Sequence, residues 1–576
     1  MYDSFLRICH DLIERSVPVK RINSLSRTHA YPVLKLQKQK LRLWRKEGNS
    51  TEYKLIASKL KSLLQSEETK TVEKHLSNGN ARDFFKYINS RYKNSSDIGV
   101  LKDSSNSPVN DDSRKASLFS ECFSAVFTTD DGNEPSFPLR TNALMDAPIF
   151  DPCTMELMLS KLSPKVNTTP ENLPAIFLKK TCTAISIPLS IIFSESYRTA
   201  CIPHSWKTAI VRPLHKKGAK TDPSNYRPIS LTSSVGKVME KILHKHLISF
   251  FNDNSLLTNC QFGFRSNRGT ESQLLSYQAS LLNNFVSKAT THSVYIDFKK
   301  AFDTVSTKKL LQKLTSYGIS SEMHNWLCSF LTDRTQQINV NGKLSEEAKV
   351  LSGVPQGSVL GPLLFLIFVN DIGDSFASNF LLYADDLKLF STNADDIEND
   401  LEKLEAWCDS WQMSVAPSKC EAISFCHRKR LTNINPTFSI NDEILPTVDK
   451  IRDLGVILGS GLSFSEHLAT TLRKAHQRVN IFFNVLRRST IDVFVKCFII
   501  YIRPILEYGT IIFSPILKDH IRLLESVQKS FLFRCYSKFN KPYISYFDCL
   551  NDCIRLAHLT PNLFFTKPIH CKFETV

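Results

Sequence analysis

The clearest pattern along the chain is a short apolar run that ends in two adjacent acids and then resumes. Residues 380–384 are mostly apolar, Asp385 and Asp386 follow, and Leu387 and Leu389 restore the alternation. This pattern predicts two strands joined by a tight turn that carries both carboxylates. Acids at such a turn are either solvated turn residues or ligands of a divalent cation, because hard cations prefer carboxylate oxygens.

Three further patterns predict polar groups at the ends of apolar segments. The alternation over 293–297 predicts a strand that ends in Asp297. The loop over 351–362 opens an apolar helix; its glycines allow close backbone approach, and Gln356 offers both a donor and an acceptor. The β-branched residues over 207–214 predict a strand, followed by a basic turn at 215–220. A basic hairpin of this kind either binds a triphosphate or is an ordinary surface hairpin.

Helical spacing and capping residues predict most of the remaining elements. Helices are expected at 113–127, 235–251, from Ser306 to Gly318, after Ser320 or Ser321, and along the apolar stripe Ile397, Leu401, Leu404, Cys408 and Trp411. Asn341-Gly342 predicts a hairpin turn. Further helices are expected at 465–488, 493–507 and 518–536. Residues 1–93 predict basic helices, including the segment 81–93, and residues 94–150 predict a linker with one short helix.

Composition narrows the class of protein. A chain of 576 residues is too long for one compact core, and 42% hydrophobic with 22% charged residues is typical of an ordered protein. The net charge of +17 indicates a polyanionic partner, first of all nucleic acid. The N-terminal basic cluster (Lys20, Arg21, Arg27, Lys35, Lys38, Lys40, Arg42, Arg45 and Lys46) is either a phosphate-binding surface or a solvated helix face.

Cysteine usage and the apolar runs bear on the compartment. The 15 cysteines have no regular spacing, and the N-terminus has no basic segment followed by an apolar run. Both features favour a reducing, intracellular compartment. The longest apolar run, 359–369, is too short to span a bilayer, so no membrane segment and no membrane partner are expected.

The order of these motifs resembles the reverse transcriptases of non-LTR retrotransposons. The resemblance covers about residues 80–535 and is strongest from Trp206 to Leu458. Any one motif is weak, but the set in this order is specific. The phrases that carry it are Asn225-Tyr-Arg-Pro-Ile-Ser, Gln261-Phe-Gly-Phe-Arg265, the strand ending at Asp297, Ala301-Phe-Asp303, Ser352-Gly-Val-Pro-Gln-Gly357, Tyr383-Ala-Asp-Asp386 and Leu454-Gly-Val-Ile-Leu458.

The resemblance implies an α/β fold with an α+β palm, arranged as a right-hand polymerase. Fingers and palm would span 151–459 (core 196–459), and a helical thumb with a C-terminal tail would span 460–576. The implied function is RNA-templated DNA synthesis, in which a DNA 3′-hydroxyl is extended by two-metal nucleotidyl transfer. The implied cofactor is a pair of Mg²⁺ ions, with Mn²⁺ as the alternative. The implied partners are an RNA template, a DNA primer or target DNA, and deoxynucleoside triphosphates. Action in the nucleus is suggested by the resemblance; the cytoplasm is the alternative.

The resemblance also assigns roles to individual residues. Asp297 and Asp385, 88 positions apart, would be the principal metal ligands, with Asp386 assisting and the carbonyl of Phe298 adding a ligand. Lys419 would protonate the pyrophosphate. Phe302 is either a steric gate against a ribose 2′-hydroxyl or a core residue. The substrate site would be lined by Gln356, Gly357 and Tyr383, with Arg212 and Arg227 on the triphosphate and Lys216 and Lys217 as alternatives.

Some positions depart from the family pattern. Ala416 stands where Asn is usual, Cys420 where Thr is usual, and Gly459 where an acid is common. No spaced acids after the thumb suggest an RNase H, and the segment before residue 80 is short for an endonuclease. These features leave open a decayed or repurposed copy that binds RNA without polymerising. A splicing factor related to intron maturases is a third, weaker alternative.

Overall fold

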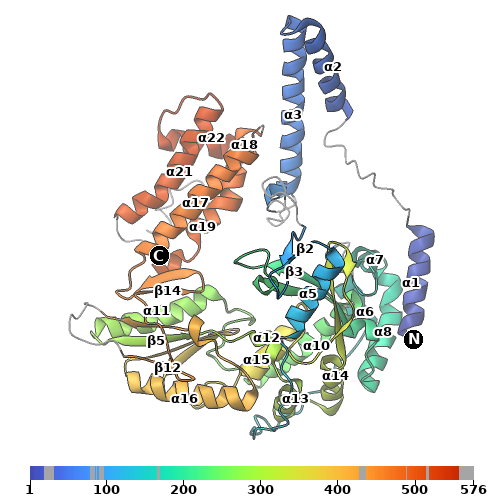
Figure 1. The fold of residues 1–576 in the computed structure, drawn as a ribbon, viewed down its shortest axis with the longest axis vertical. Coiled ribbons are helices and arrows are strands. Elements are labelled where there is room, and N and C mark those ends of the chain that lie inside the picture. Colours follow the sequence, from blue (N-terminus) through green and yellow to red (C-terminus); the bar gives the residue numbers. More distant parts are fainter. Residues whose placement is uncertain are drawn as a thin grey trace. The chain divides into compact units, whose positions relative to one another are not determined.

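The computed structural model divides the chain into two compact units (Figure 1). Unit 1 comprises Met1–Pro18 and Asp97–Ile451, and unit 2 comprises Val19–Ser96 and Arg452–Val576. The structure describes residues 1–17, 31–77, 85, 87–89, 97–164, 169–426, 436–487, 489–513 and 518–556. Lys20, Arg21, Arg27, most of the predicted segment 81–93 and the tail beyond 556 lie outside these residues. The domain boundaries expected from the sequence stay a prediction, because compactness alone does not define fingers, palm or thumb.

A four-stranded antiparallel sheet lies at the centre of unit 1. Its order is β11 (Glu421–Phe425), β5 (Thr291–Ile296), β10 (Asp386–Ser391), β9 (Asn379–Tyr383). The register pairs Leu387 with Ile296 across β10 and β5, and Asp386 with Tyr383 across the β9–β10 hairpin. The helix α16 (Ala394–Trp411) packs on β5 and β10 (Figure 1). Its apolar stripe is buried, as its spacing predicts.

A five-stranded sheet forms the second layer of strands in unit 1. Its order is β4 (Tyr226–Leu231), β3 (Thr208–His215), β6 (Arg334–Val340), β7 (Lys343–Leu344), with β8 (Ala348–Val350) also paired to β6. The β3–β4 hairpin is antiparallel, whereas β3 and β6 are parallel. The helix α5 (Asp112–Ser124) covers this sheet with Phe119 and Phe123, which share a core with Val211 and Ile338.

Helices pack around these sheets, and the buried residues of unit 1 form a large core at the four-stranded sheet and a smaller one under α5. The apolar helix α15 (Gly361–Val369) is buried along its whole length, which explains why it reads as a continuous apolar run. The Ser306 hydroxyl accepts from the Lys309 N–H and so caps α13, as the sequence predicts. The other elements of unit 1 are α1 (Tyr2–Ser16), α6 (Pro152–Ser160), α7 (Ala175–Lys180), α8 (Cys182–Thr199), α9 (His204–Lys207), α10 (Ser234–Asp253), α11 (Thr270–Val286), α12 (Ala301–Thr304), α13 (Thr307–Ser316), α14 (Ser321–Leu331) and the two-residue strands β1 (Leu101–Lys102), β2 (Pro108–Val109), β12 (Ser439–Ile440) and β13 (Glu443–Ile444).

Unit 2 is largely helical. It contains α2 (Tyr31–Glu47) and α3 (Thr51–Ser77), and it begins again within β14 (Lys450–Asp453), whose last two residues belong to it. β15 (Val456–Gly459) follows, and then α17 (Ser465–Val485), α18 (Ile491–Cys497), α19 (Arg503–Glu507), α20 (Thr510–Phe513), α21 (Lys518–Lys538) and α22 (Tyr546–Leu556). Val72 of α3 joins the core formed by Phe482, Phe498 and Phe531. A segment from before residue 96 therefore shares a core with helices from the other end of the chain.

One predicted helix of unit 2 is divided into three consecutive segments. The range 493–507 contains the end of α18, a π-helical turn at Phe498–Ile502 and α19. Pro504 lies in the first turn of α19, where its missing N–H and its ring interrupt the ladder of the preceding helix. No helix within the described ranges is long and apolar enough to cross a membrane.

Candidate active site

Two carboxylates far apart in sequence meet at one end of the central sheet. Asp297 directly follows β5, and Asp385 lies in the turn between β9 and β10. Because Leu387 pairs with Ile296, one further step of the register places Asp386 opposite Asp297. The turn is tight: Ala384 adopts the left-handed conformation with φ 58°, which costs about 1–2 kcal/mol for a residue other than glycine. The sheet thus brings Asp297 and the acidic turn together.

The electrostatics of Asp385 reflect this meeting. Burial, followed by the negative charge of Asp297, raises the pKa of the Asp385 carboxyl. The positive charges of Arg227 and Lys216 act in the opposite direction. Two carboxylates that disfavour each other's ionisation gain from a shared counter-cation. Their environment is therefore suited to binding a positive ligand.

The donor set fits a divalent cation with an incomplete protein shell. Mg²⁺ is typically bound through one or two carboxylates and completes its shell with water and substrate phosphates. Asp297 is 46% exposed at its side chain and Asp386 is exposed, so both are open to solvent. Within the described ranges, no three His, Cys, Asp or Glu side chains lie close enough to form a preformed metal cluster. The site accordingly resembles an open, substrate-completed site rather than a closed protein cage.

The backbone after Asp297 also contributes to this geometry. The Asp297 carbonyl accepts from the Ala416 N–H at 2.8 Å, and the Lys299 N–H donates to the Ser414 carbonyl at 2.7 Å. These bonds hold the segment on the β11 side. Successive carbonyls of an extended segment point to opposite edges. The Phe298 carbonyl is therefore directed toward the β10 side, where the acidic turn lies.

Lys419 lies beside Asp297. Its Nζ is 3.2 Å from Asp297 Oδ1, and it ends a short 3₁₀ turn, Pro417–Lys419. The two departures from the family pattern in this segment are buried and contact the same acid. Cys420 Sγ accepts from the Asp297 N–H at 3.4 Å, and Ala416 donates to the Asp297 carbonyl. Both substituted positions therefore still support Asp297.

The basic β3–β4 hairpin brings some of the predicted cations to this site. Arg212 pairs with Ile229 and Leu214 with Arg227, so both arginines lie on one face of the hairpin, at exposed positions. The positive charges of Arg227 and Lys216 both lower the pKa of Asp385. Burial, and then the charge of Arg227, lowers the pKa of Lys216. Lys216, which the sequence offered as an alternative triphosphate contact, therefore interacts electrostatically with both Asp385 and Asp297.

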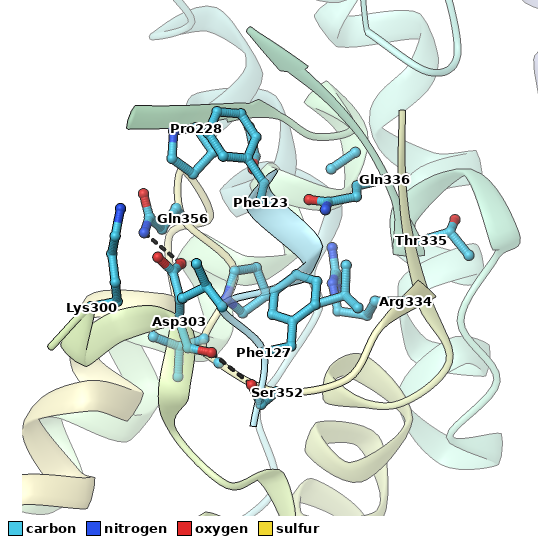
Figure 2. Close-up of a pocket in the computed structure, with 17 residues that line it drawn as sticks. Phe123, Phe127, Pro228, Lys300, Asp303, Arg334, Thr335, Gln336, Ser352 and Gln356 are labelled. Atoms are coloured by element: carbon cyan, nitrogen blue, oxygen red, sulfur yellow. Dashed lines mark hydrogen bonds between the residues drawn. The ribbon is translucent and has the colours of Figure 1, made fainter. Parts of the chain in front are cut away.

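The loop that carries Gln356 closes on α12. Gln356 Nε2 donates to Asp303 Oδ1 at 2.6 Å, and the Ser352 hydroxyl donates to the Asp303 carbonyl at 2.7 Å; Figure 2 shows both bonds. Gly357 has φ 94°, and a Cβ there would be 2.5 Å from the Ser230 carbonyl oxygen of β4. The adjoining pocket, between this loop and Phe123 and Phe127, has a volume of about 50 Å³. This volume has room for water-sized molecules but is too small for a nucleotide.

Phe302 and Tyr383 are both half-buried near these elements. The Phe302 ring stacks on the Phe365 ring, with 4.2 Å between the ring centroids and an interplanar angle of 18°. The Phe264 ring packs edge-on against it, with 6.2 Å between the centroids. This packing fixes the ring while leaving part of it accessible. Tyr383 ends β9 opposite Asp386. The structure therefore places Tyr383 beside the acidic turn and Phe302 on α12.

Sequence reasoning missed the role of Asp303. Burial raises the pKa of its carboxyl, while the hydrogen bond from Gln356 lowers it. The acid was visible in Ala301-Phe-Asp303, but only as part of a family phrase. The local sequence carries no signal of its burial, because Lys299, Lys300 and Thr304 make the surrounding segment look like an exposed one. Its partner lies 53 positions away, which the local sequence does not reveal.

Comparison with known proteins defines the class. Residues 214–458 match the family model described as reverse transcriptase (RNA-dependent DNA polymerase). Residues 214–458 therefore correspond to a reverse transcriptase domain, and the mixed α/β fold expected from the sequence is confirmed, whereas its division into fingers, palm and thumb stays a prediction. Within that class the chain is similar to the RNA-directed DNA polymerases of non-LTR retrotransposons, as the motifs predicted.

Two relatives and one solved structure illustrate the similarity. The chain is 30% identical over 426 residues to the probable RNA-directed DNA polymerase from transposon BS of Drosophila melanogaster, covering 70% of this chain and 46% of the relative. It is 27% identical over 365 residues to the RNA-directed DNA polymerase from mobile element jockey of the same species, covering 60% and 39%. The structure of apo telomerase from Candida Tropicalis matches with a TM-score of 0.37 at 11% identity, covering 68% of this chain and 73% of that one. The chain spans less than half the length of these two relatives.

Proposed function

We propose that this chain is an RNA-templated DNA polymerase of the non-LTR retrotransposon type, which extends a DNA 3′-hydroxyl with deoxynucleoside triphosphates. One observation carries the proposal: Asp297 and Asp385 meet at the ends of adjacent strands, and the charge of Asp297 raises the pKa of Asp385. Nucleotidyl transfer depends mainly on positioning and charge neutralisation. An acidic pair beside basic side chains supplies both.

The proposed cofactor is a pair of divalent cations, Mg²⁺ with Mn²⁺ as the alternative, held by Asp297, Asp385, Asp386 and the Phe298 carbonyl. When bound, such ions would activate the primer hydroxyl and neutralise charge on the leaving group. Arg227 and Lys216 then bind the triphosphate. Lys419 holds an ammonium proton beside Asp297, within reach of a departing pyrophosphate.

The remaining proposed contacts orient the nucleotide. Gln356 and Gly357 line the site from the loop over α12, and Tyr383 lines it from β9. The hydrogen bond from Gln356 to Asp303 supports this role, because it fixes one amide orientation. Arg212 would act farther along the triphosphate, on the exposed face that it shares with Arg227.

The proposed nucleic-acid partners are an RNA template and a DNA primer or target DNA. Unit 2, which contains the proposed thumb (460–576), supports this with a cavity of about 850 Å³ between the β14–β15 hairpin and helices α17 and α19. Cationic and aromatic side chains line it, among them Arg452, Lys474, Arg478, Tyr501 and Tyr508. Lysine and arginine neutralise phosphates, and aromatic rings stack on bases. Action in the nucleus or the cytoplasm is part of the same proposal.

The alternative function is binding of RNA without polymerisation by a decayed copy. The departures at Ala416, Cys420 and Gly459 were among the features that motivated it, yet Ala416 and Cys420 still contact Asp297. Primer extension separates the two functions. Purified protein is given an RNA template, an annealed DNA primer, deoxynucleoside triphosphates and Mg²⁺, and product length is measured with Asp385→Asn as control. Extension by the wild type alone supports the polymerase; binding of the RNA with no extension supports the remnant.

The sugar preference tests the proposed role of Phe302. Phe302→Val is expected to lower the preference for deoxynucleotides over ribonucleotides by about 100-fold, because the smaller side chain no longer clashes with a 2′-hydroxyl. The measurement is the ratio of kcat/KM for the two substrates on one template. The stack of Phe302 on Phe365 is lost in the same variant, so thermal unfolding is followed in parallel. An unchanged ratio in a folded variant would make Phe302 a core residue.

A further inference from the structure

The turn that carries Asp385 is held by a segment well before it in the sequence. Residues 260–263 run beside β9 as a short parallel addition to the sheet. The Leu382 N–H donates to the Cys260 carbonyl at 2.9 Å, and the Phe262 N–H donates to the Leu382 carbonyl at 2.8 Å. These two bonds bring the side chain of Gln261 to the level of the turn.

The Gln261 side chain binds the backbone of the turn directly. It is 2% exposed. Its Oε1 accepts from the Ala384 N–H at 2.9 Å and from the Gly263 N–H at 2.8 Å, and its Nε2 donates to the Ala384 carbonyl at 3.4 Å. Both backbone polar groups of Ala384, the residue with φ 58°, are therefore bound by a single side chain. An amide is suited to this, because it offers an acceptor and a donor side by side.

The residues next to Gln261 hold its segment close to the turn. A Cβ on Gly263 would be 2.3 Å from the Ala384 nitrogen, so only glycine allows the close approach. Arg265 Nη1 donates to the Thr258 carbonyl at 2.7 Å, and Arg268 Nη2 donates to Asn259 Oδ1 at 2.9 Å. Hydrogen bonds from these two arginines to the residues before Gln261 thus stabilise the segment that carries it.

We propose that Gln261 is a positioning residue that fixes the left-handed conformation of Ala384 and, through it, the direction of the Asp385 carboxylate toward Asp297. The inference rests on the proposed polymerase function for its effect on catalysis. A two-residue turn has few alternative conformations, and each of them directs the following side chain differently. Without the amide, the Ala384 N–H and carbonyl lose their partners and the strained conformation loses its support.

The test compares Gln261→Met with Gln261→Glu and a matched control. Gln261→Met keeps the length of the side chain but removes both polar groups. It is expected to lower kcat for primer extension by about 100-fold, the scale of a 1 Å misplacement, with KM for the deoxynucleotide nearly unchanged. Gln261→Glu keeps the acceptor and is expected to recover part of kcat. The control is Gln273→Met, a buried glutamine whose amide has no hydrogen-bond partner in the described part of the chain.

Amide hydrogen exchange provides a readout that does not depend on activity. In Gln261→Met, the peptide covering 380–390 is expected to exchange faster, while the peptide covering β11 stays protected. If Gln261→Met exchanges faster in this hairpin but the wild type shows no primer extension, the positioning role of Gln261 is supported and the proposed polymerase function is contradicted. Unchanged exchange overturns the inference, as does a loss confined to KM or an equal loss of kcat in Gln273→Met.

Discussion

Replacing Asp385 with asparagine is expected to abolish primer extension and, at the same time, to stabilise the metal-free protein. The loss of activity should be at least about 10³-fold, because a carboxylate ligand to an activating cation contributes several kcal/mol to the transition state. The gain in stability follows from the meeting of Asp385 with Asp297, which, together with burial, disfavours the ionised carboxyl. Asparagine keeps the shape of the side chain and removes its charge.

The sign of the effect depends on pH. The folded-state pKa of Asp385 is raised above its unfolded value, so its contribution to stability is fully present below the unfolded pKa of about 3.9 and is lost as pH rises through the folded pKa. Asp385→Asn should therefore raise Tm by roughly 1–3 °C at about pH 7.5 in a chelator and leave it unchanged near about pH 4.

Divalent ions provide the second readout of this variant. Saturating Mg²⁺ should raise the Tm of the wild type by mass action and have little effect on Asp385→Asn. Asp409→Asn, at an exposed position on α16, is the control that changes the same charge away from the site. A variant that is less stable than the wild type at neutral pH without metal would show that the carboxylate is already satisfied by the protein. That result would remove the electrostatic argument for a cation site.

The strands and their acids could be predicted because the pattern that specifies them is local. The apolar run at 380–384, the alternation from Leu387 to Leu389 and the segment 293–297 predicted β9, β10 and β5, and the acids at their ends required no knowledge of the rest of the chain. The ends of α13 and the loop before α15 could also be predicted, because their signals too are local. That Asp297 and Asp385 lie together rested on the resemblance, since 88 positions separate them.

The polar contacts that support the site could not be predicted. Gln261 binds a turn 123 positions away and Asp303 binds a glutamine 53 positions away, so burial of either is decided by tertiary structure. A buried glutamine and an exposed one read alike in a sequence. The same limit applies to α3, which shares a core with helices near the other end of unit 2. Periodicity assigns a face to a helix but does not name the segment that covers it.

A buried lysine shows most clearly where the hydrophobic pattern of a helix fails to predict which side chains are buried. Lys313 on α13 is fully buried, although a lysine in an amphipathic helix is normally assigned to the solvent face. It forms an ion pair with Asp371, and its Nζ donates to the Phe368 carbonyl at 2.6 Å. Four aromatic rings surround the ammonium, with centroids at 3.6 to 5.1 Å: Trp411, Trp407, Phe368 and Phe137. Burial lowers its pKa to about 8, so it remains mainly charged at neutral pH.

Lys313→Ala is therefore expected to destabilise unit 1 by about 3–5 kcal/mol, because it leaves Asp371 buried without its partner and opens a cavity among the rings. The measurement is urea unfolding followed by tryptophan fluorescence, since four of the five tryptophans lie in unit 1 and two of them contact Lys313. Lys308→Ala is the matched control on the same helix. Lys308 forms an ion pair with Glu134 at 2.7 Å, but its side chain is 50% exposed, so its loss should not move the midpoint.

A double variant separates the charge from the packing. In an Asp371→Asn background, Lys313→Met should cost less than in the wild type, because no buried anion is left unpaired. Asp371 also accepts a hydrogen bond from Trp407 Nε1 of α16 at 2.9 Å. The Asp371 carboxylate thus connects Lys313 of α13 with α16, the helix that packs on β5 and β10. This contact therefore supports the helix that packs on the two strands next to Asp297 and Asp386. If Lys313→Ala unfolds at the same urea concentration as Lys308→Ala, the ion pair between Lys313 and Asp371 does not stabilise unit 1.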